Sequence, residues 1–118
     1  MAGITIYHNP RCSKSRQTLQ LLRDRGVEPH VVEYLKNPPS AAQLKRLLSL
    51  LQMGPRELMR TKEAEYKALN LADPKLSKDS LIKAMAEHPV LIERPIVVAG
   101  DRAVIGRPPE KALDIISQ

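Results

Sequence analysis

The residue best suited to chemistry is Cys12, the only cysteine among 118 residues. It follows a short apolar run, 4–7, and the turn pair Asn9-Pro10, and it precedes a stretch, 13–25, with helical spacing of apolar residues. A strand, a turn and a helix in this order place the sulfur at a helix N-terminus, where unpaired N–H groups and the helix dipole stabilise an anion. We therefore predict a thiolate whose pKa lies below the value of about 8.5 for a free cysteine.

Two side chains near Cys12 in the sequence could act on its sulfur. His8 lies four residues before it and Ser15 three residues after it. A protonated His8 would stabilise a thiolate, whereas a neutral ring could simply cap the turn. The Ser15 hydroxyl could donate to the sulfur or bond within its own helix turn. The spacing leaves both pairs of alternatives open. One cysteine among scattered histidines predicts no metal site.

Two arginines are predicted to face each other near the end of the chain. Gly100-Asp101 is typical of a two-residue hairpin loop between apolar strands at 96–98 and 103–105. Continuing that antiparallel register away from the loop places Arg94 opposite Arg107, unless a bulge shifts the pairing. Opposed guanidinium groups repel unless they splay into water or share an anion, and they suit a tetrahedral oxyanion. The bond between Arg94 and the next residue, a proline, can be trans or cis.

The elements before this hairpin form two groups. A strand at 4–7, a helix at 13–25 closed by Gly26, and a second strand containing Val31, Val32 and Tyr34 predict a parallel β-α-β unit. Leu19 and Leu22 are expected to face inward. A helical stretch follows: a capping box opened by Ser40, short helical turns within 56–71, and a helix over 77–87.

The last segment completes the expected fold. Both faces of strands 96–98 and 103–105 are apolar, so we expect both to be covered, and Pro108-Pro109 opens a final helix that runs through Ile116. The order β-α-β, helical insertion, β-β-α predicts an α/β fold with a mixed sheet close to a thioredoxin-like plan. We expect one domain over 1–118 with the insertion at about 40–88.

Composition narrows the classes of function. The 42% hydrophobic and 27% charged residues are ordinary for a soluble protein. There is no basic-plus-apolar signal region and no apolar run near the roughly 20 residues that cross a bilayer, so we expect a cytoplasmic protein without a membrane partner. The net charge of +6 could favour nucleic acid, but the basic residues are scattered among acidic ones and aromatics are few. A small anionic substrate accounts for the charge as well.

The segment from His8 to Arg16, after the strand at 4–7, resembles the glutaredoxin-coupled arsenate reductases, the ArsC family. The likeness continues through 33–39, 57–60, 88–98 and 106–108, and so covers nearly the whole chain. The family fold is thioredoxin-like with a helical insertion, in agreement with the element order.

The resemblance implies an arsenate reductase involved in arsenical resistance, with Cys12 as the nucleophile. It further implies that His8 and Ser15 tune the thiol, and that the oxyanion is held by an arginine triad, Arg60, Arg94 and Arg107. Only the resemblance points to Arg60. The implied partners are arsenate, glutathione as co-substrate and glutaredoxin, with no bound cofactor. Thiolate attack on arsenate, addition of glutathione and its removal by glutaredoxin would release arsenite.

Three other functions share some of these features. A general thiol-redox protein would use Cys12 without arsenate activity. Relatives that bind RNA polymerase as regulators typically carry Cys-x-x-Cys, whereas this chain has Ser15 at the second position. A low-molecular-weight phosphatase needs an arginine six residues after the cysteine, and Thr18 occupies that position. The phosphatase is therefore excluded, and the other two remain alternatives.

Overall fold

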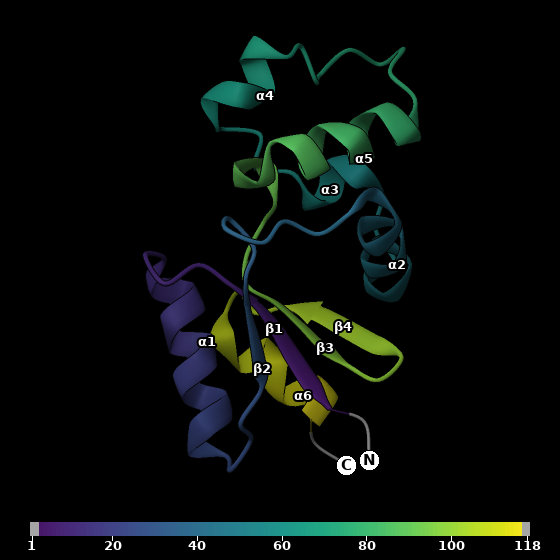
Figure 1. Cartoon of the computed structure of the whole chain (residues 1–118). Coiled ribbons are helices and arrows are strands. Elements are labelled where there is room, and N and C mark those ends of the chain that lie inside the picture. Colours follow the sequence, from purple (N-terminus) through teal and green to yellow (C-terminus); the bar gives the residue numbers. More distant parts are fainter. Residues whose placement is uncertain (1–2, 117–118) are drawn as a thin grey trace. The chain divides into compact units, whose positions relative to one another are not determined.

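The computed structural model describes residues 3–116, which divide into two compact units. The first unit combines the chain up to Asn37 with the chain from Arg94 onward, and the second runs from Pro38 to Glu93 (Figure 1). No helix within 3–116 is both long and apolar enough to cross a membrane. The prediction of one domain over 1–118 with an insertion at about 40–88 stays a prediction.

A four-stranded mixed sheet organises the first unit. Its strands in chain order are β1 (Ile4–His8), β2 (His30–Glu33), β3 (Ile96–Ala99) and β4 (Arg102–Ile105). Their order across the sheet is β2-β1-β3-β4, with β1 parallel to β2 and antiparallel to β3. The predicted β-α-β unit and the terminal hairpin are both confirmed.

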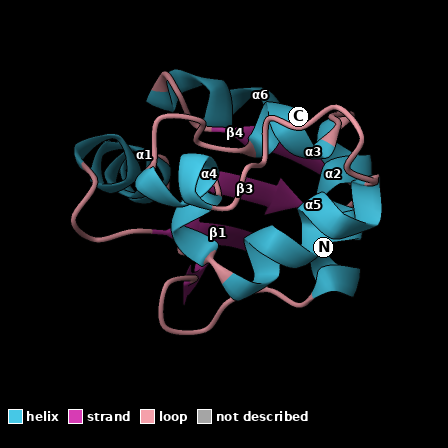
Figure 2. Cartoon of the chain, turned by 90° about the horizontal axis from the view of Figure 1, so that it is seen from above, coloured by secondary structure: helices cyan, strands magenta, loops and turns pink. Residues whose placement is uncertain are grey.

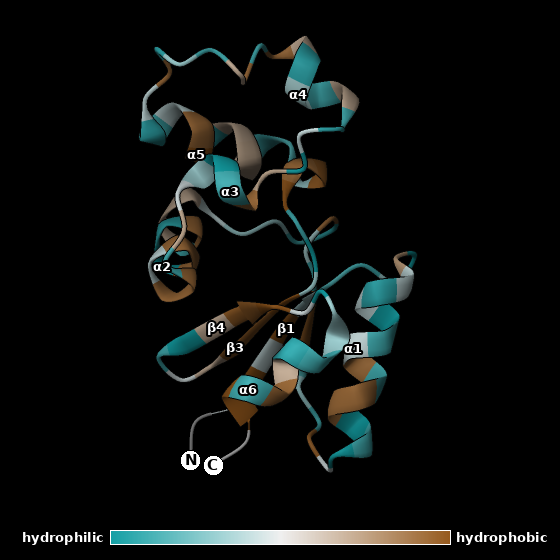
Figure 3. Ribbon diagram, turned by 180° about the vertical axis from the view of Figure 1, so that it is seen from behind, coloured by the Kyte–Doolittle hydropathy of each residue, from teal (hydrophilic) through white to brown (hydrophobic). Residues whose placement is uncertain are grey.

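Helices cover one face of this sheet. These are α1 (Ser13–Asp24), the short 3-10 helix η2 (Pro109–Ala112) and α6 (Leu113–Ile116). The core between them contains Ile6 and Val97 from the sheet together with Leu22, Ala112 and Ile115 from the helices. Figure 3 shows the apolar character of the strands and of part of α1. Cover on the second face of the sheet stays a prediction.

The first unit differs from the sequence predictions at two points. Tyr34 is buried but lies beyond β2, because the chain turns after Glu33, whose carbonyl accepts the N–H groups of Lys36 and Asn37. The single final helix is instead η2 followed by α6, an arrangement in which the first turn has the tighter 3-10 geometry that is frequent at helix ends.

Among its described residues, the second unit consists of helices joined by loops (Figure 2). They are α2 (Ala41–Leu51), α3 (Pro55–Leu58), α4 (Ala64–Ala68), α5 (Lys78–Glu87) and the 3-10 helix η1 (Pro89–Leu91). The predicted capping box is present: Ser40 Oγ accepts from the N–H of Gln43, whose side chain accepts in return from the N–H of Ser40. An isolated antiparallel bridge pairs Met59 with Ile92.

Candidate active site

Cys12 is the N-cap residue of α1, as the sequence predicts. Its backbone is extended, its N–H donates to the Asn9 carbonyl at 3.0 Å, and its own carbonyl accepts the first helical bond from Arg16. The Asn9 side chain accepts from the N–H of Arg11 at 3.0 Å and so shapes the turn. This turn therefore leads directly from the end of β1 into α1 and carries the sulfur at the junction.

The surroundings of Cys12 favour its charged form. Partial burial of the sulfur raises its pKa, but the backbone N–H groups of Ser15 and Lys14 and the side chain of Arg94 outweigh this, so the pKa of the Cys12 thiol is lowered. The first turn of α1 contains no acidic residue that would oppose the effect. A lowered pKa makes the nucleophilic thiolate more abundant at neutral pH.

The hairpin has the predicted register. Strands β3 and β4 pair Ile96 with Ile105, and one step further the N–H of Gly106 donates to the Pro95 carbonyl at 2.9 Å. This continuation brings the next residues on each side, Arg94 and Arg107, to the same end of the hairpin. The peptide bonds that follow these two arginines, to Pro95 and Pro108, are both cis.

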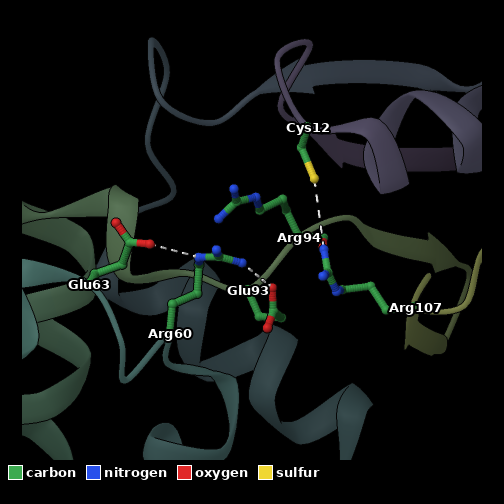
Figure 4. A network of polar contacts seen from close by, with 6 residues as sticks. All are labelled: Cys12, Arg60, Glu63, Glu93, Arg94 and Arg107. Atoms are coloured by element: carbon green, nitrogen blue, oxygen red, sulfur yellow. Dashed lines mark hydrogen bonds and ion pairs between the residues drawn. The ribbon is translucent and has the colours of Figure 1, made fainter.

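Arg107 contacts both the sulfur and the backbone of Arg94. Its Nη1 donates to Cys12 Sγ at 3.7 Å and lies 3.4 Å from the carbonyl oxygen of Arg94 (Figure 4). The Arg94 side chain also acts on the sulfur, both as a hydrogen-bond donor and through its charge. Two guanidinium groups beside one thiolate give a site whose charge suits an oxyanion.

His8 and Ser15 bond to each other. His8 Nδ1 and Ser15 Oγ are 2.7 Å apart, and the same hydroxyl accepts from the N–H of Asn9 at 3.0 Å. Burial lowers the pKa of His8, with a further decrease from Arg23 and Arg16 and an opposing effect of Glu33, so the neutral form of the ring is favoured. These contacts tie the end of β1 to the first turn of α1.

Arg60 belongs to the second unit and is surrounded by carboxylates there. Its Nε lies 3.2 Å from Glu63 and its Nη1 2.7 Å from Glu93 (Figure 4), and its N–H donates to the carbonyl of Leu91. Although partial burial lowers the pKa of Arg60, these two carboxylates raise it overall. The oxyanion-binding role of Arg60 stays a prediction. The sequence analysis missed both glutamates: the spacing of three residues between Arg60 and Glu63 was visible in the sequence, whereas only a long-range contact joins Glu93 to Arg60.

The sequence analysis also missed what Thr18 does. This residue is fully buried, and its hydroxyl contacts the carbonyls of Lys14 and Gly106. A helix face containing Ser15, Thr18 and Leu22 at intervals of three and four residues was visible in the sequence. A pattern built from apolar residues alone does not include it, because two of the three residues are polar. Within 3–116, no group of three or more His, Cys, Asp or Glu side chains could hold a metal ion.

Comparison with known proteins agrees with this geometry. A family model described as the ArsC family matches residues 7–115. The protein YfgD of Escherichia coli K12, described as uncharacterized, is 60% identical over 114 residues, which is 96% of each chain. A protein of Haemophilus influenzae named arsenate reductase is 49% identical over 115 residues, covering 97% of this chain and 99% of its own length.

Comparison with solved structures gives the same result as the comparison of sequences. The structure titled arsenate reductase from Vibrio cholerae is 55% identical, covers 97% of this chain and 98% of its own, and superposes with a TM-score of 0.94. With this match, the mixed sheet and its helices are identified as thioredoxin-like, as the sequence predicts. The family model and these relatives each cover nearly the whole chain, and the protein therefore belongs to the ArsC family.

Proposed function

We propose that this protein reduces arsenate to arsenite, with Cys12 as the nucleophile. The observation that carries the proposal is the 3.7 Å contact between Arg107 Nη1 and the Cys12 sulfur, at a thiol whose pKa is lowered. Relatives named arsenate reductases, at 49% and 55% identity over nearly the whole chain, support the same reaction. A thiolate beside two guanidinium groups can both attract the oxyanion and attack it.

The first step forms a bond between sulfur and arsenic. The Cys12 thiolate attacks arsenic(V), and one arsenate oxygen takes up protons and leaves as water. No electron is transferred to arsenic at this stage, because one ligand simply replaces another. Arg94 and Arg107 stabilise the negative charge of the adduct. In other enzymes the removal of one such donor costs roughly 100-fold to 1,000-fold in rate.

The electrons come from two external thiols. This chain has a single cysteine and cannot form an internal disulfide, so the proposal assigns the reducing thiols to glutathione and glutaredoxin. Glutathione replaces a second oxygen on arsenic, and that oxygen leaves as water. A glutaredoxin thiolate then attacks the glutathione sulfur, and the sulfur–arsenic bond electrons stay on arsenic. The products are a mixed disulfide and arsenic(III), and water releases arsenite from Cys12.

The remaining site residues have supporting roles in this proposal. A neutral His8 cannot pair with the thiolate as a cation, so we assign its effect on Cys12 to the bond with Ser15, which steadies the first turn of α1. Arg60 is included on the family resemblance. The proposal also places the protein in the cytoplasm, where glutathione keeps thiols reduced.

The test measures arsenite formed by the purified protein with arsenate, glutathione and glutaredoxin. We expect turnover by the wild type and none by Cys12→Ser. Arg94→Ala should lose at least about 100-fold in arsenite formation, while in a separate reaction with glutathione disulfide its Cys12 still becomes glutathionylated by thiol–disulfide exchange. Arg102→Ala, which removes an exposed arginine at the start of β4, is the matched control and should keep the wild-type rate.

Two results would contradict the proposal in different ways. Arsenite no higher than in the Cys12→Ser reaction would exclude arsenate reduction. Equal arsenite formation by Arg94→Ala and the wild type would show that Arg94 does not serve arsenate. A regulator that binds RNA polymerase would give the first of these results and would retain the polymerase in a binding assay.

A further inference from the structure

A buried hydroxyl links α1 to the end of the hairpin. Thr18 is 0% exposed, and the single proton of its Oγ1 hydroxyl is shared between the carbonyls of Lys14 at 2.8 Å and of Gly106 at 3.1 Å. The contact with Lys14 stays within the helix turn. The contact with Gly106 joins residues that are 88 positions apart in the chain, so it holds together two segments of the first unit that the sequence keeps separate.

Gly106 fits closely against Thr18. A Cβ atom at position 106 would lie 2.8 Å from both Thr18 Oγ1 and Cγ2 and 3.1 Å from Pro95 Cγ. Since Cβ atoms do not approach other heavy atoms below 3.0 Å, a side chain at position 106 would force the Thr18 side chain to shift. The N–H of Gly106 donates in turn to the Pro95 carbonyl at 2.9 Å. The backbone at Gly106 is therefore fixed from both sides.

These contacts connect the segment that carries Cys12 with the segment that carries Arg107. Cys12 begins the helix that carries Thr18, and Arg107 directly follows Gly106. We propose that Thr18 is a positioning residue that, through its hydroxyl bond to Gly106, holds the Arg107 guanidinium beside the Cys12 sulfur. The competing explanation is that the Thr18 hydroxyl serves only to bond the Lys14 carbonyl within α1, as threonines in helices often do. The contact with Gly106 would then have no further effect.

The test compares two reagents that alkylate Cys12. Iodoacetate is an anion and iodoacetamide is its neutral counterpart, so the ratio of their rates reports positive charge beside the sulfur. A change in the thiolate fraction alters both rates equally and leaves the ratio unchanged. The experiment needs neither arsenate nor glutathione, so its failure is distinguishable from failure of the proposed function.

The key variant is Thr18→Val, which keeps the shape of the side chain and removes the hydroxyl. We expect its iodoacetate-to-iodoacetamide ratio to fall toward that of Arg107→Gln, by up to about fivefold, the factor for a unit charge 4 Å away under water-like screening. Thr18→Ser keeps the hydroxyl and should retain the wild-type ratio. Thr61→Val makes the same chemical change at an exposed threonine and should also retain it. Circular dichroism checks folding.

Gly106→Ala tests the same contact from the other side. Its methyl group would displace the Thr18 side chain, and we expect a comparable fall in the ratio. A wild-type ratio in a folded Thr18→Val or Gly106→Ala protein would overturn the proposal, as would an equal loss in Thr18→Ser. Loss of fold in both Thr18→Val and Gly106→Ala would also overturn it, because the contact would then hold the whole unit together instead of one guanidinium.

Discussion

At the scale of single residues, the reactivity of Cys12 depends on groups that outweigh its partial burial. The amide groups of Ser15 and Lys14 come from the first turn of α1, whereas Arg94 comes from the segment before β3. Helix amides act on any residue at this position, but the arginine supplies a full charge. The loss of the Arg94 side chain should therefore raise the pKa of the thiol.

We predict that Cys12 reacts with iodoacetamide through a titration midpoint below that of the same thiol in the urea-unfolded chain. Arg94→Gln should raise the midpoint, because it removes both a donor and a charge. Arg102→Gln, at an exposed position, serves as the control. An unchanged midpoint in Arg94→Gln would remove this arginine from the account of the thiolate.

The lowered pKa of Cys12 also makes the free energy of unfolding depend on pH. Because the folded thiol loses its proton at lower pH than the unfolded one, it adds to the free energy of unfolding above the pKa of the unfolded chain. This contribution is lost as the pH falls through the lowered folded pKa. Urea titrations of the wild type and Cys12→Ser across that range should diverge as the pH rises.

At the scale of elements, the sequence predicts most of what places the sulfur and the arginine pair. The turn before α1 and Gly26 after it set the helix ends, and Gly26 has the left-handed backbone (φ 78°) expected of a helix stop. The two-residue loop sets the hairpin register, from which Arg94 and Arg107 follow. The place of a residue on a helix or a hairpin can be predicted from local rules, because each rule involves only residues that are close in the sequence.

The parts that could not be predicted depend on contacts between elements. Ser15 and Thr18 are polar, and apolar periodicity predicts exposure for them, yet buried partners satisfy both hydroxyls. Tyr34 fits the pattern of a strand but lies beyond one. Glu93, which pairs with Arg60 across 33 positions, gives no local signal. A single sequence shows which side chains can bond, but not which distant groups the fold brings to them.

We predict that Ser15→Ala destabilises the protein by about 2 kcal/mol, because a buried N–H and a buried imidazole each lose a partner. Chemical denaturation provides the measurement. Ser13→Ala, on an exposed side chain of the same helix, is the matched control and should change stability by less than about 0.5 kcal/mol. Equal effects of the two substitutions would show that the His8–Ser15 bond contributes little.

At the scale of the whole molecule, the net charge of +6 bears on how an anion reaches the site. An excess of positive charge raises the encounter rate of anions at low ionic strength, and salt screens this attraction over about 10 Å at 0.1 M. The effect depends on charge summed over the chain and requires no additional binding residue. It also needs no run of basic side chains, which this sequence lacks.

We predict that kcat/KM for arsenate falls severalfold as potassium chloride is raised from low to moderate concentration, while alkylation of Cys12 by neutral iodoacetamide stays nearly constant. Steady-state assays over a salt series test this, with the alkylation rate as the internal control for any change in the thiol itself. Parallel changes in the two rates would show that charge steering contributes nothing.

The close fit of Gly106 against Thr18 limits which substitutions these two positions can accept during evolution. A side chain can enter position 106 only if position 18 gives up volume, and such an exchange also deletes the hydroxyl. Position 106 therefore cannot gain a side chain first without a strained intermediate, whereas position 18 can become smaller first without strain. In proteins that descend from this one, a side chain at position 106 should therefore appear only where position 18 already holds a smaller residue.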